Sequence, residues 1–196
     1  MKLTIDTLKK TLTAKGYKWY TDRPNIIGIR ATLDVPDVFN DLLCLVYPKN
    51  GSEELKVYTI TTDPGVHYQK KLLNAKGCAV LKPGQYENAY SVGLHQSKAT
   101  HKALVQTGPV TVYRDNDMDG QIDTVGMKEE KGLFGVNIHG ANAGVVTQKI
   151  GPWSAGCQVF NTWANKEELV TICTAFKDVT GNKFTYTLLN EKDIIA

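Results

Sequence analysis

Two residues with chemically reactive side chains, His139 and Cys157, stand at the ends of two apolar segments. Residues 133–138 are largely apolar and predict a buried strand that ends at His139. A glycine-containing loop follows, and the tetrapeptide 154–157 (SAGC) leads into a second apolar run. A thiol is mostly protonated near pH 7, and an adjacent imidazole activates it by taking its proton, which leaves a thiolate beside an imidazolium. The pattern predicts a Cys–His pair, provided that the loop brings the two strand ends together.

The alternative is structural. A single cysteine at the start of a strand is usually a small buried apolar residue, and a single histidine usually serves packing. A non-enzymatic structural or binding module that keeps the fold without turnover therefore stays open beside the catalytic hypothesis.

The stretch 133–160 resembles the catalytic motif of the L,D-transpeptidase (YkuD-type) family. That motif has a histidine, a spacer of about a dozen or more residues, Ser or Thr, His-Gly-Cys, a hydrophobic residue, and Asn or Arg. Here fourteen residues separate His139 from Ser154, and Gly156-Cys157 completes the core. Three residues depart from the family pattern: Ala155 in place of the second histidine, Gln158 in place of the hydrophobic residue, and Val159 in place of Asn or Arg.

The resemblance implies a mechanism. Cys157 would be the nucleophile and His139 the general base, acting on stem peptides of peptidoglycan through a thioester. The acyl group would pass to an amine, which is transpeptidation, or to water. A peptidoglycan hydrolase, an L,D-carboxypeptidase or endopeptidase associated with lysis or a phage, is therefore the alternative enzyme. No cofactor is expected for the catalysis.

Further residues are expected to complete this site. The backbone N–H groups at Ala155, Gly156 and Cys157 are candidate oxyanion donors. A third group must orient the imidazole, and either the backbone at Gly140 or Ser154 is a candidate. Three residues are candidates for substrate contact or pocket shape: Asn137, Trp153 and His95. His101, by contrast, is expected on the surface.

A second candidate site is the acidic loop RDNDMDGQID at residues 114–123. It resembles the front half of a calcium loop, with carboxylates at alternate positions and a glycine that permits a sharp turn. The position where a bidentate Glu belongs is Gly126. The alternatives are a structural Ca²⁺ site and an acidic turn without metal, and the candidate ligands are Asp115, Asp117, Asp119 and Asp123.

Composition excludes several classes of protein. A net charge of +3 over 196 residues, without a basic cluster, predicts no nucleic-acid partner. The four cysteines have no zinc spacing, and no apolar run is long enough to predict a membrane span. The first residues lack an apolar signal core, so we expect a chain that is cytoplasmic as synthesised. Action in the periplasm or cell wall then requires another route, such as a virion or secretion-machine partner.

The elements that must position these residues are mostly short strands. The sequence predicts a mainly β fold, β-sandwich-like with a mixed sheet, with a short N-terminal helix over 4–15 and a packed C-terminal helix from Asn165 to Gly181. We expect residues 1–20 to form a helix and linker and residues 21–196 to form one β-rich domain, which the resemblance implies to be L,D-transpeptidase-like. Asn50-Gly51 predicts a hairpin turn. The remaining predicted strands are 26–32, 42–47, 55–61, 79–81, 89–94, 103–106, 110–113, 158–160 and 183–189.

Overall fold

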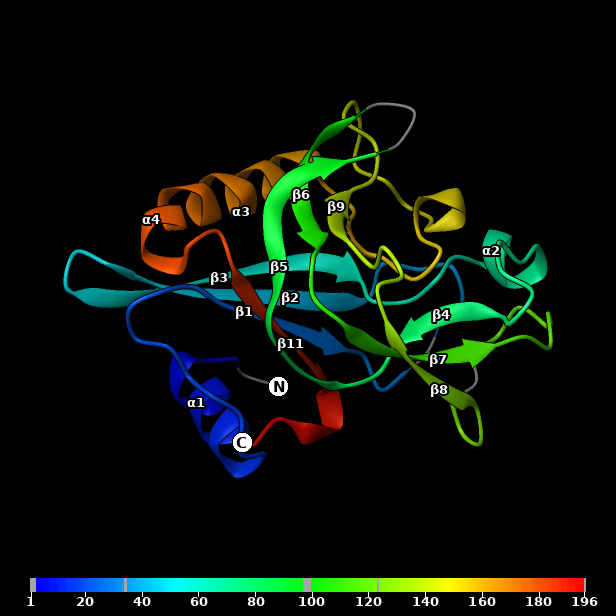
Figure 1. The fold of residues 1–196 in the computed structure, drawn as a ribbon, viewed down its shortest axis with the longest axis horizontal. Helices are drawn as coiled ribbons and strands as arrows, with labels where there is room; N and C mark the ends of the chain where they lie inside the picture. The colour runs from blue at the N-terminus through cyan, green and yellow to red at the C-terminus, as the bar shows by residue number, and fades with distance from the viewer. Residues whose placement is uncertain (1–2, 34, 97–99, 123, 196) are drawn as a thin grey trace.

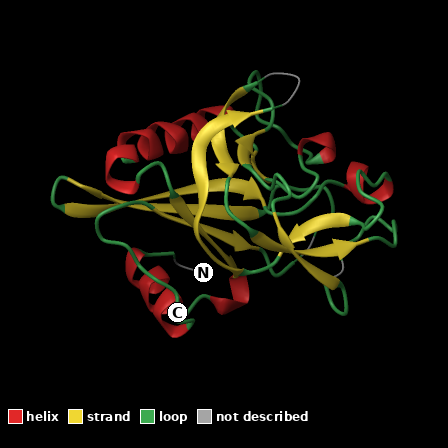
Figure 2. Cartoon of the chain, in the orientation of Figure 1, coloured by secondary structure: helices red, strands yellow, loops and turns green. Residues whose placement is uncertain are grey.

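A computed structural model describes residues 3–33, 35–96, 100–122 and 124–195. In these residues eight strands close into a mixed barrel, with a three-stranded sheet beside it and the helices outside (Figures 1 and 2). The order around the barrel is β1 (Asn25–Arg30), β11 (Phe184–Asn190), β5 (Gly84–His95), β6 (His101–Gln106), β9 (Ile138–Gly140), β10 (Gln158–Phe160), β3 (Ser52–Thr61) and β2 (Asp41–Lys49). The small sheet has the order β4 (Cys78–Leu81), β7 (Val110–Asp115) and β8 (Lys128–Gly132).

The mainly β fold with a mixed sheet and helices near both ends is confirmed. The strands close into a barrel, where a sandwich-like arrangement was expected. The closure depends on β1, which pairs antiparallel with β2 and parallel with β11. Ile26 lies opposite Tyr186 in the parallel pairing, so the first and last strands of the chain are neighbours.

The predicted hairpin is confirmed. β2 and β3 pair along their full lengths, from Asp41 with Ile60 to Lys49 with Ser52. Asn50 and Gly51 both have positive φ, 51° and 80°. Two central residues with positive φ are the requirement of a type I′ turn, whose twist matches that of the flanking strands.

Helix α1 (Ile5–Ala14) begins after Thr4, whose side chain accepts a hydrogen bond from the Thr7 backbone while Thr7 bonds back to Thr4. This reciprocal pair satisfies two backbone donors at the helix start. Leu8 and Leu12 pack against apolar residues on the outer face of the barrel. The predicted N-terminal helix is thus confirmed, and Figure 1 shows it on the other side of the barrel from α3 (Trp163–Ala175).

The C-terminal helical region begins three residues before the predicted start. α3 has Thr162, not Asn165, as its N-terminal capping residue, and it contacts β5, β6, β9 and β10. The short α4 (Lys177–Thr180) ends at Gly181, which has a φ of 61°. The remaining elements are α2 (Val66–Lys70) and two short 3-10 turns, η1 (Gly151–Trp153) and η2 (Glu191–Asp193).

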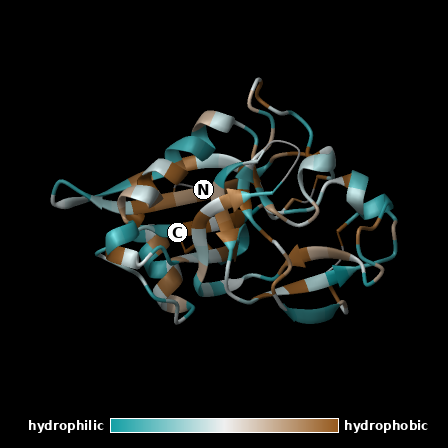
Figure 3. Ribbon diagram, turned by 45° about the horizontal axis from the view of Figure 1, so that its top comes forward, coloured by the Kyte–Doolittle hydropathy of each residue, from teal (hydrophilic) through white to brown (hydrophobic). Residues whose placement is uncertain are grey.

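One buried apolar cluster fills the barrel and continues to α3 and the inner side of the small sheet. Gly28 of β1 is required there, because a Cβ atom at this position would lie 1.9 Å from the Tyr186 hydroxyl. β8, with the sequence KEEKG, is mainly hydrophilic and forms one edge of the small sheet (Figure 3). Of the described helices, none has the length and apolarity needed to cross a membrane.

Candidate active site

Strands β9 and β10 run parallel as neighbours, with His139 opposite Val159. Cys157 comes two residues before Val159 and packs against a small apolar cluster that contains Val159, together with Phe39, Ala141 and Ile150, so it lies on the face that carries Val159. Ile138 and Phe160 belong to the core on the opposite face. His139 of β9 and Cys157, which directly precedes β10, therefore lie on the same side of these two strands.

His139 is only 4% exposed. Its Nδ1 lies 3.0 Å from the carbonyl oxygen of Gly140. Its Nε2 is buried and has no hydrogen-bond partner among the described residues. Burial, reinforced by the nearby His95, lowers the pKa of the His139 imidazole to about 3. The ring is therefore neutral at physiological pH.

Cys157 is partly exposed, and its thiol donates a 3.4 Å hydrogen bond to the carbonyl of Gly135. Desolvation raises the pKa of this thiol to about 11. A backbone hydrogen bond with Asn137 has the opposite, smaller effect and lowers the pKa. Within the described chain no hydrogen bond joins the Cys157 sulfur to the His139 ring. The resting pair is thus a thiol and a neutral imidazole, which differs from the thiolate–imidazolium pair expected from the sequence.

The loop before Cys157 has a fixed backbone. The Ser154 hydroxyl donates a 2.8 Å hydrogen bond to the Cys157 carbonyl and accepts one of 3.2 Å from the Gly156 N–H. Gly156 has a φ of 122°, and a Cβ atom there would lie 2.2 Å from the carbonyl oxygen of Ala79. Ser154 therefore holds the backbone of this loop in place. The imidazole of His139 is instead held by the carbonyl of Gly140. The Gly156 N–H, a predicted oxyanion donor, is already engaged.

The imidazole rings of His95, His101 and His139 lie close together. The rings of His95 and His139 stack with centroids 4.1 Å apart and planes 13° apart. His101 lies 5.2 Å from His95 and 4.6 Å from the Trp163 ring. The expectation that His101 lies on the surface is wrong, because the β5–β6 pairing places it beside His95 and α3 covers it with Trp163.

Lys166 of α3 completes the cluster and is completely buried. Its Nζ lies 3.6 Å from the centroid of the Trp163 ring and 3.4 Å from the Lys102 carbonyl oxygen, and it pairs with the Glu167 carboxylate. A buried ammonium needs such partners. No sequence pattern indicates this role, since a lysine in an amphipathic helix is usually solvated.

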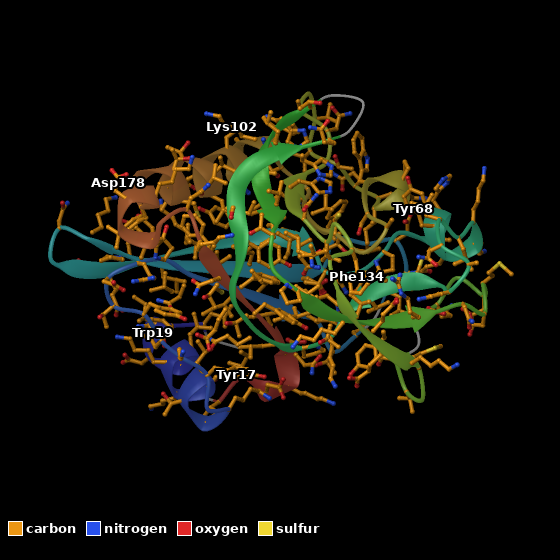
Figure 4. The ribbon with its side chains drawn as sticks, in the orientation of Figure 1. Tyr17, Trp19, Tyr68, Lys102, Phe134 and Asp178 are labelled. Carbon is orange, nitrogen blue, oxygen red and sulfur yellow. The ribbon has the colours of Figure 1, made fainter. Side chains whose placement is uncertain are left out.

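A cavity of about 390 Å³ lies beside the Cys157 loop. Ala155 lines it from the loop, and Phe134 lines it from the segment that leads to Gly135, the partner of the Cys157 thiol. Figure 4 labels Phe134 and Tyr68 of α2, which also lines the cavity. The other lining residues are Leu73, Asn74, Gly77, Cys78, Ala79, Arg114 and Leu133.

The three predicted substrate contacts lie in different surroundings. The Asn137 side chain hydrogen-bonds His95 Nδ1 at 3.0 Å and the Gln106 N–H at 2.8 Å. Asn137 and His95 therefore join the His139 cluster. Trp153, 38% exposed in η1, has no hydrogen bond or ring contact with that cluster in the described part of the chain.

The acidic loop follows β7. Asp115 is 4% exposed, the Asp117 carboxylate accepts the Asp119 N–H at 3.1 Å, and the Asp119 carboxylate accepts the Gln121 N–H at 2.7 Å. Asp123 lies outside the described residues. Among those that are described, no three or more His, Cys, Asp or Glu side chains group so as to hold a metal ion. Calcium binding stays a prediction.

Comparison of the chain with protein-family models, with curated proteins and with solved structures gives no match. The chemistry of the site therefore has to be inferred from its own geometry. The arrangement offers a partly exposed thiol, a buried neutral imidazole on the same strand face, and a neighbouring cavity lined by apolar and polar groups.

Proposed function

We propose that the chain is a cysteine-dependent acyltransferase or peptidase of the L,D-transpeptidase kind, with Cys157 as nucleophile and His139 as base. The observation that supports this most is the state of His139. Because a carbonyl oxygen only accepts hydrogen bonds, the contact with Gly140 puts the ring proton on Nδ1. The lone pair is then on Nε2, which has no hydrogen-bond partner among the described residues.

In this proposal the thiol and imidazole are neutral at rest, and the thiol proton moves to Nε2 as sulfur attacks the substrate carbonyl. The tetrahedral intermediate then expels the amine, which takes the proton from His139, and leaves a thioester on Cys157. An incoming amine, or water, attacks the thioester and regenerates the thiol. Peptidoglycan stem peptides are the proposed acyl donors, as the motif resemblance implies. The cavity beside Ala155 can receive part of the donor.

The test is turnover of a muropeptide with a tetrapeptide stem, followed by mass spectrometry with and without an amine acceptor. We expect the wild type to form a Cys157 thioester and Cys157→Ala to form none. Cys78→Ala is the matched control, because Cys78 lines the same cavity and its burial raises the pKa of its thiol to about 11 as well. Turnover by Cys157→Ala would reject the proposal. A cross-linked product indicates transfer, and a shortened stem indicates hydrolysis.

A second candidate function is a structural or binding module without turnover. The observation that favours it is that both key groups are neutral and not hydrogen-bonded to each other in the described chain. Intact mass of the chain after incubation with the tetrapeptide muropeptide separates the two candidates. An active pair gains the acyl mass as a thioester on Cys157, whereas a module without turnover gains none.

A further inference from the structure

The amide of Asn137 has a fixed orientation. The Gln106 N–H can only donate, so the atom that it contacts at 2.8 Å is the amide oxygen of Asn137. The amide nitrogen therefore faces His95 Nδ1 at 3.0 Å. An amide nitrogen only donates, so Nδ1 of His95 accepts. Neutral His95 consequently carries its proton on Nε2.

His139 has the opposite tautomer. The Gly140 carbonyl holds the proton on Nδ1 and leaves the lone pair on Nε2. Both assignments rest on backbone groups, since the Gln106 N–H and the Gly140 carbonyl belong to strands of the barrel. The tautomers of two neighbouring imidazoles are thus set by the sheet itself.

The stack restricts rotation of the His139 ring. A flip of the ring about its Cβ–Cγ bond, which would exchange Nδ1 with Cδ2 and Nε2 with Cε1 and so remove Nδ1 from the Gly140 carbonyl, requires the ring to turn through an orientation perpendicular to its present plane. A parallel ring 4.1 Å away leaves no room for that turn, because aromatic half-thicknesses already fill the gap. The charged and titratable neighbours of His139 are His95, His101 and Lys166, and Lys166 is paired with Glu167.

We propose that His95 is a positioning residue for His139: its stacked ring, held by Asn137, keeps Nδ1 of His139 on the Gly140 carbonyl and Nε2 available as the base. The importance of this role for turnover rests on the proposed function, but the placement of the ring does not. His95 thereby acts through His139 and needs no contact with the reacting atoms.

The experiment is ¹⁵N NMR of the histidine rings in the full chain, combined with the rate of thioester formation by Cys157. In the wild type we expect one tautomer for each residue, Nδ1–H for His139 and Nε2–H for His95. His95→Ala should give mixed tautomers at His139 and a rate lower by roughly 10- to 100-fold, as a misplaced catalytic group does. His95→Phe keeps a flat ring and should restore the single tautomer and most of the rate.

His67→Ala is the matched control, since His67 of α2 has a ring contact with Tyr68 outside this cluster. It should change neither readout. If His95→Ala does not fold, Asn137→Asp tests the same arrangement, because its carboxylate still accepts from Gln106 and should move the His95 proton to Nδ1.

Failure of the proposed function alone would appear as intact tautomers with turnover in Cys157→Ala. A single Nδ1–H tautomer of His139 in His95→Ala, or an unchanged Nε2–H tautomer of His95 in Asn137→Asp, would overturn the inference.

Discussion

The Tyr186 hydroxyl donates a 2.8 Å hydrogen bond to Oε1 of Gln158 inside the barrel, where both side chains are completely buried. This contact explains a polar residue immediately after Cys157. β10 turns Gln158 toward the barrel interior, and Tyr186 needs an acceptor there because a buried hydroxyl without a partner is costly. Gln158, which departs from the family motif at this position, therefore has a structural role in the barrel.

We predict that Tyr186→Phe and Gln158→Leu each lower the free energy of unfolding by about 1–3 kcal/mol, because each leaves a buried polar partner unsatisfied. The double variant should lose less than the sum of the two single losses. Urea unfolding of the four proteins measures this coupling. Strictly additive losses would contradict a direct bond between the two side chains.

The backbone at Gly156 should tolerate no side chain. Gly156→Ala adds a Cβ atom 2.2 Å from the Ala79 carbonyl oxygen at a φ of 122°, so the Cys157 loop must move. We expect the free energy of unfolding to fall by at least about 2 kcal/mol and thioester formation at Cys157 to be lost. Gly144→Ala is the control, because its nearest contact would be 3.6 Å away and no positive φ is involved. Equal stability of the two variants would contradict the observed loop.

Burial of His139 predicts acid sensitivity. In the unfolded chain a histidine takes up a proton near pH 6.5, whereas folding lowers the pKa of His139 to about 3. Between these values the unfolded state binds more protons, so stability falls as pH falls from about 6.5 to 3, by up to about 5 kcal/mol for this shift.

The comparison with His139→Leu isolates this contribution. The stability of the variant relative to the wild type should improve as pH falls through that window, measured by urea unfolding at each pH. Burial raises the pKa of the Asp41 carboxyl to about 6, which disfavours the folded state as pH rises through that value. Because this contribution is the same in both proteins, it cancels when the stability of the wild type is subtracted from that of the variant. His67→Leu controls for loss of an imidazole elsewhere. A stability difference that does not change with pH would refute the prediction.

Calcium binding by the acidic loop predicts a rise in melting temperature with Ca²⁺ concentration, because a ligand of the folded state stabilises it by mass action. Asp117→Asn and Asp119→Asn should abolish the rise. Mg²⁺ is the control cation, since it demands a smaller and more rigid octahedral site. An absence of both binding heat and melting shift with Ca²⁺ would reject the site.

The parts of the fold that the sequence predicts best are those determined by local chemistry. Asn50-Gly51 specifies its turn, Thr4 caps α1, and Gly181 ends the C-terminal helical region. The barrel closure lies beyond such signals, because the parallel pairing of Ile26 with Tyr186 joins opposite ends of the chain. No local pattern encodes that register.

The candidate site likewise has residues that local sequence patterns indicate and residues that only long-range contacts bring into place. The ends of two apolar runs indicate His139 and Cys157, and a strand period of two residues explains why they share a face. The stack of His95 on His139 depends on two strand pairings, of β5 with β6 and of β6 with β9, which sequence periodicity does not predict. The burial of Lys166 likewise depends on contacts with other elements, among them the Lys102 carbonyl of β6.

The charged strand β8 has a consequence for self-association. Glu129 pairs with Lys82, and Glu130 pairs with Lys76 and Arg114, so both carboxylates already have cations within the chain. A second copy adding itself as a fourth strand would have to desolvate these ion pairs and bring like charges together. Charged edge strands of this kind oppose amyloid-like growth, and β8 therefore protects the exposed edge of the small sheet against aggregation.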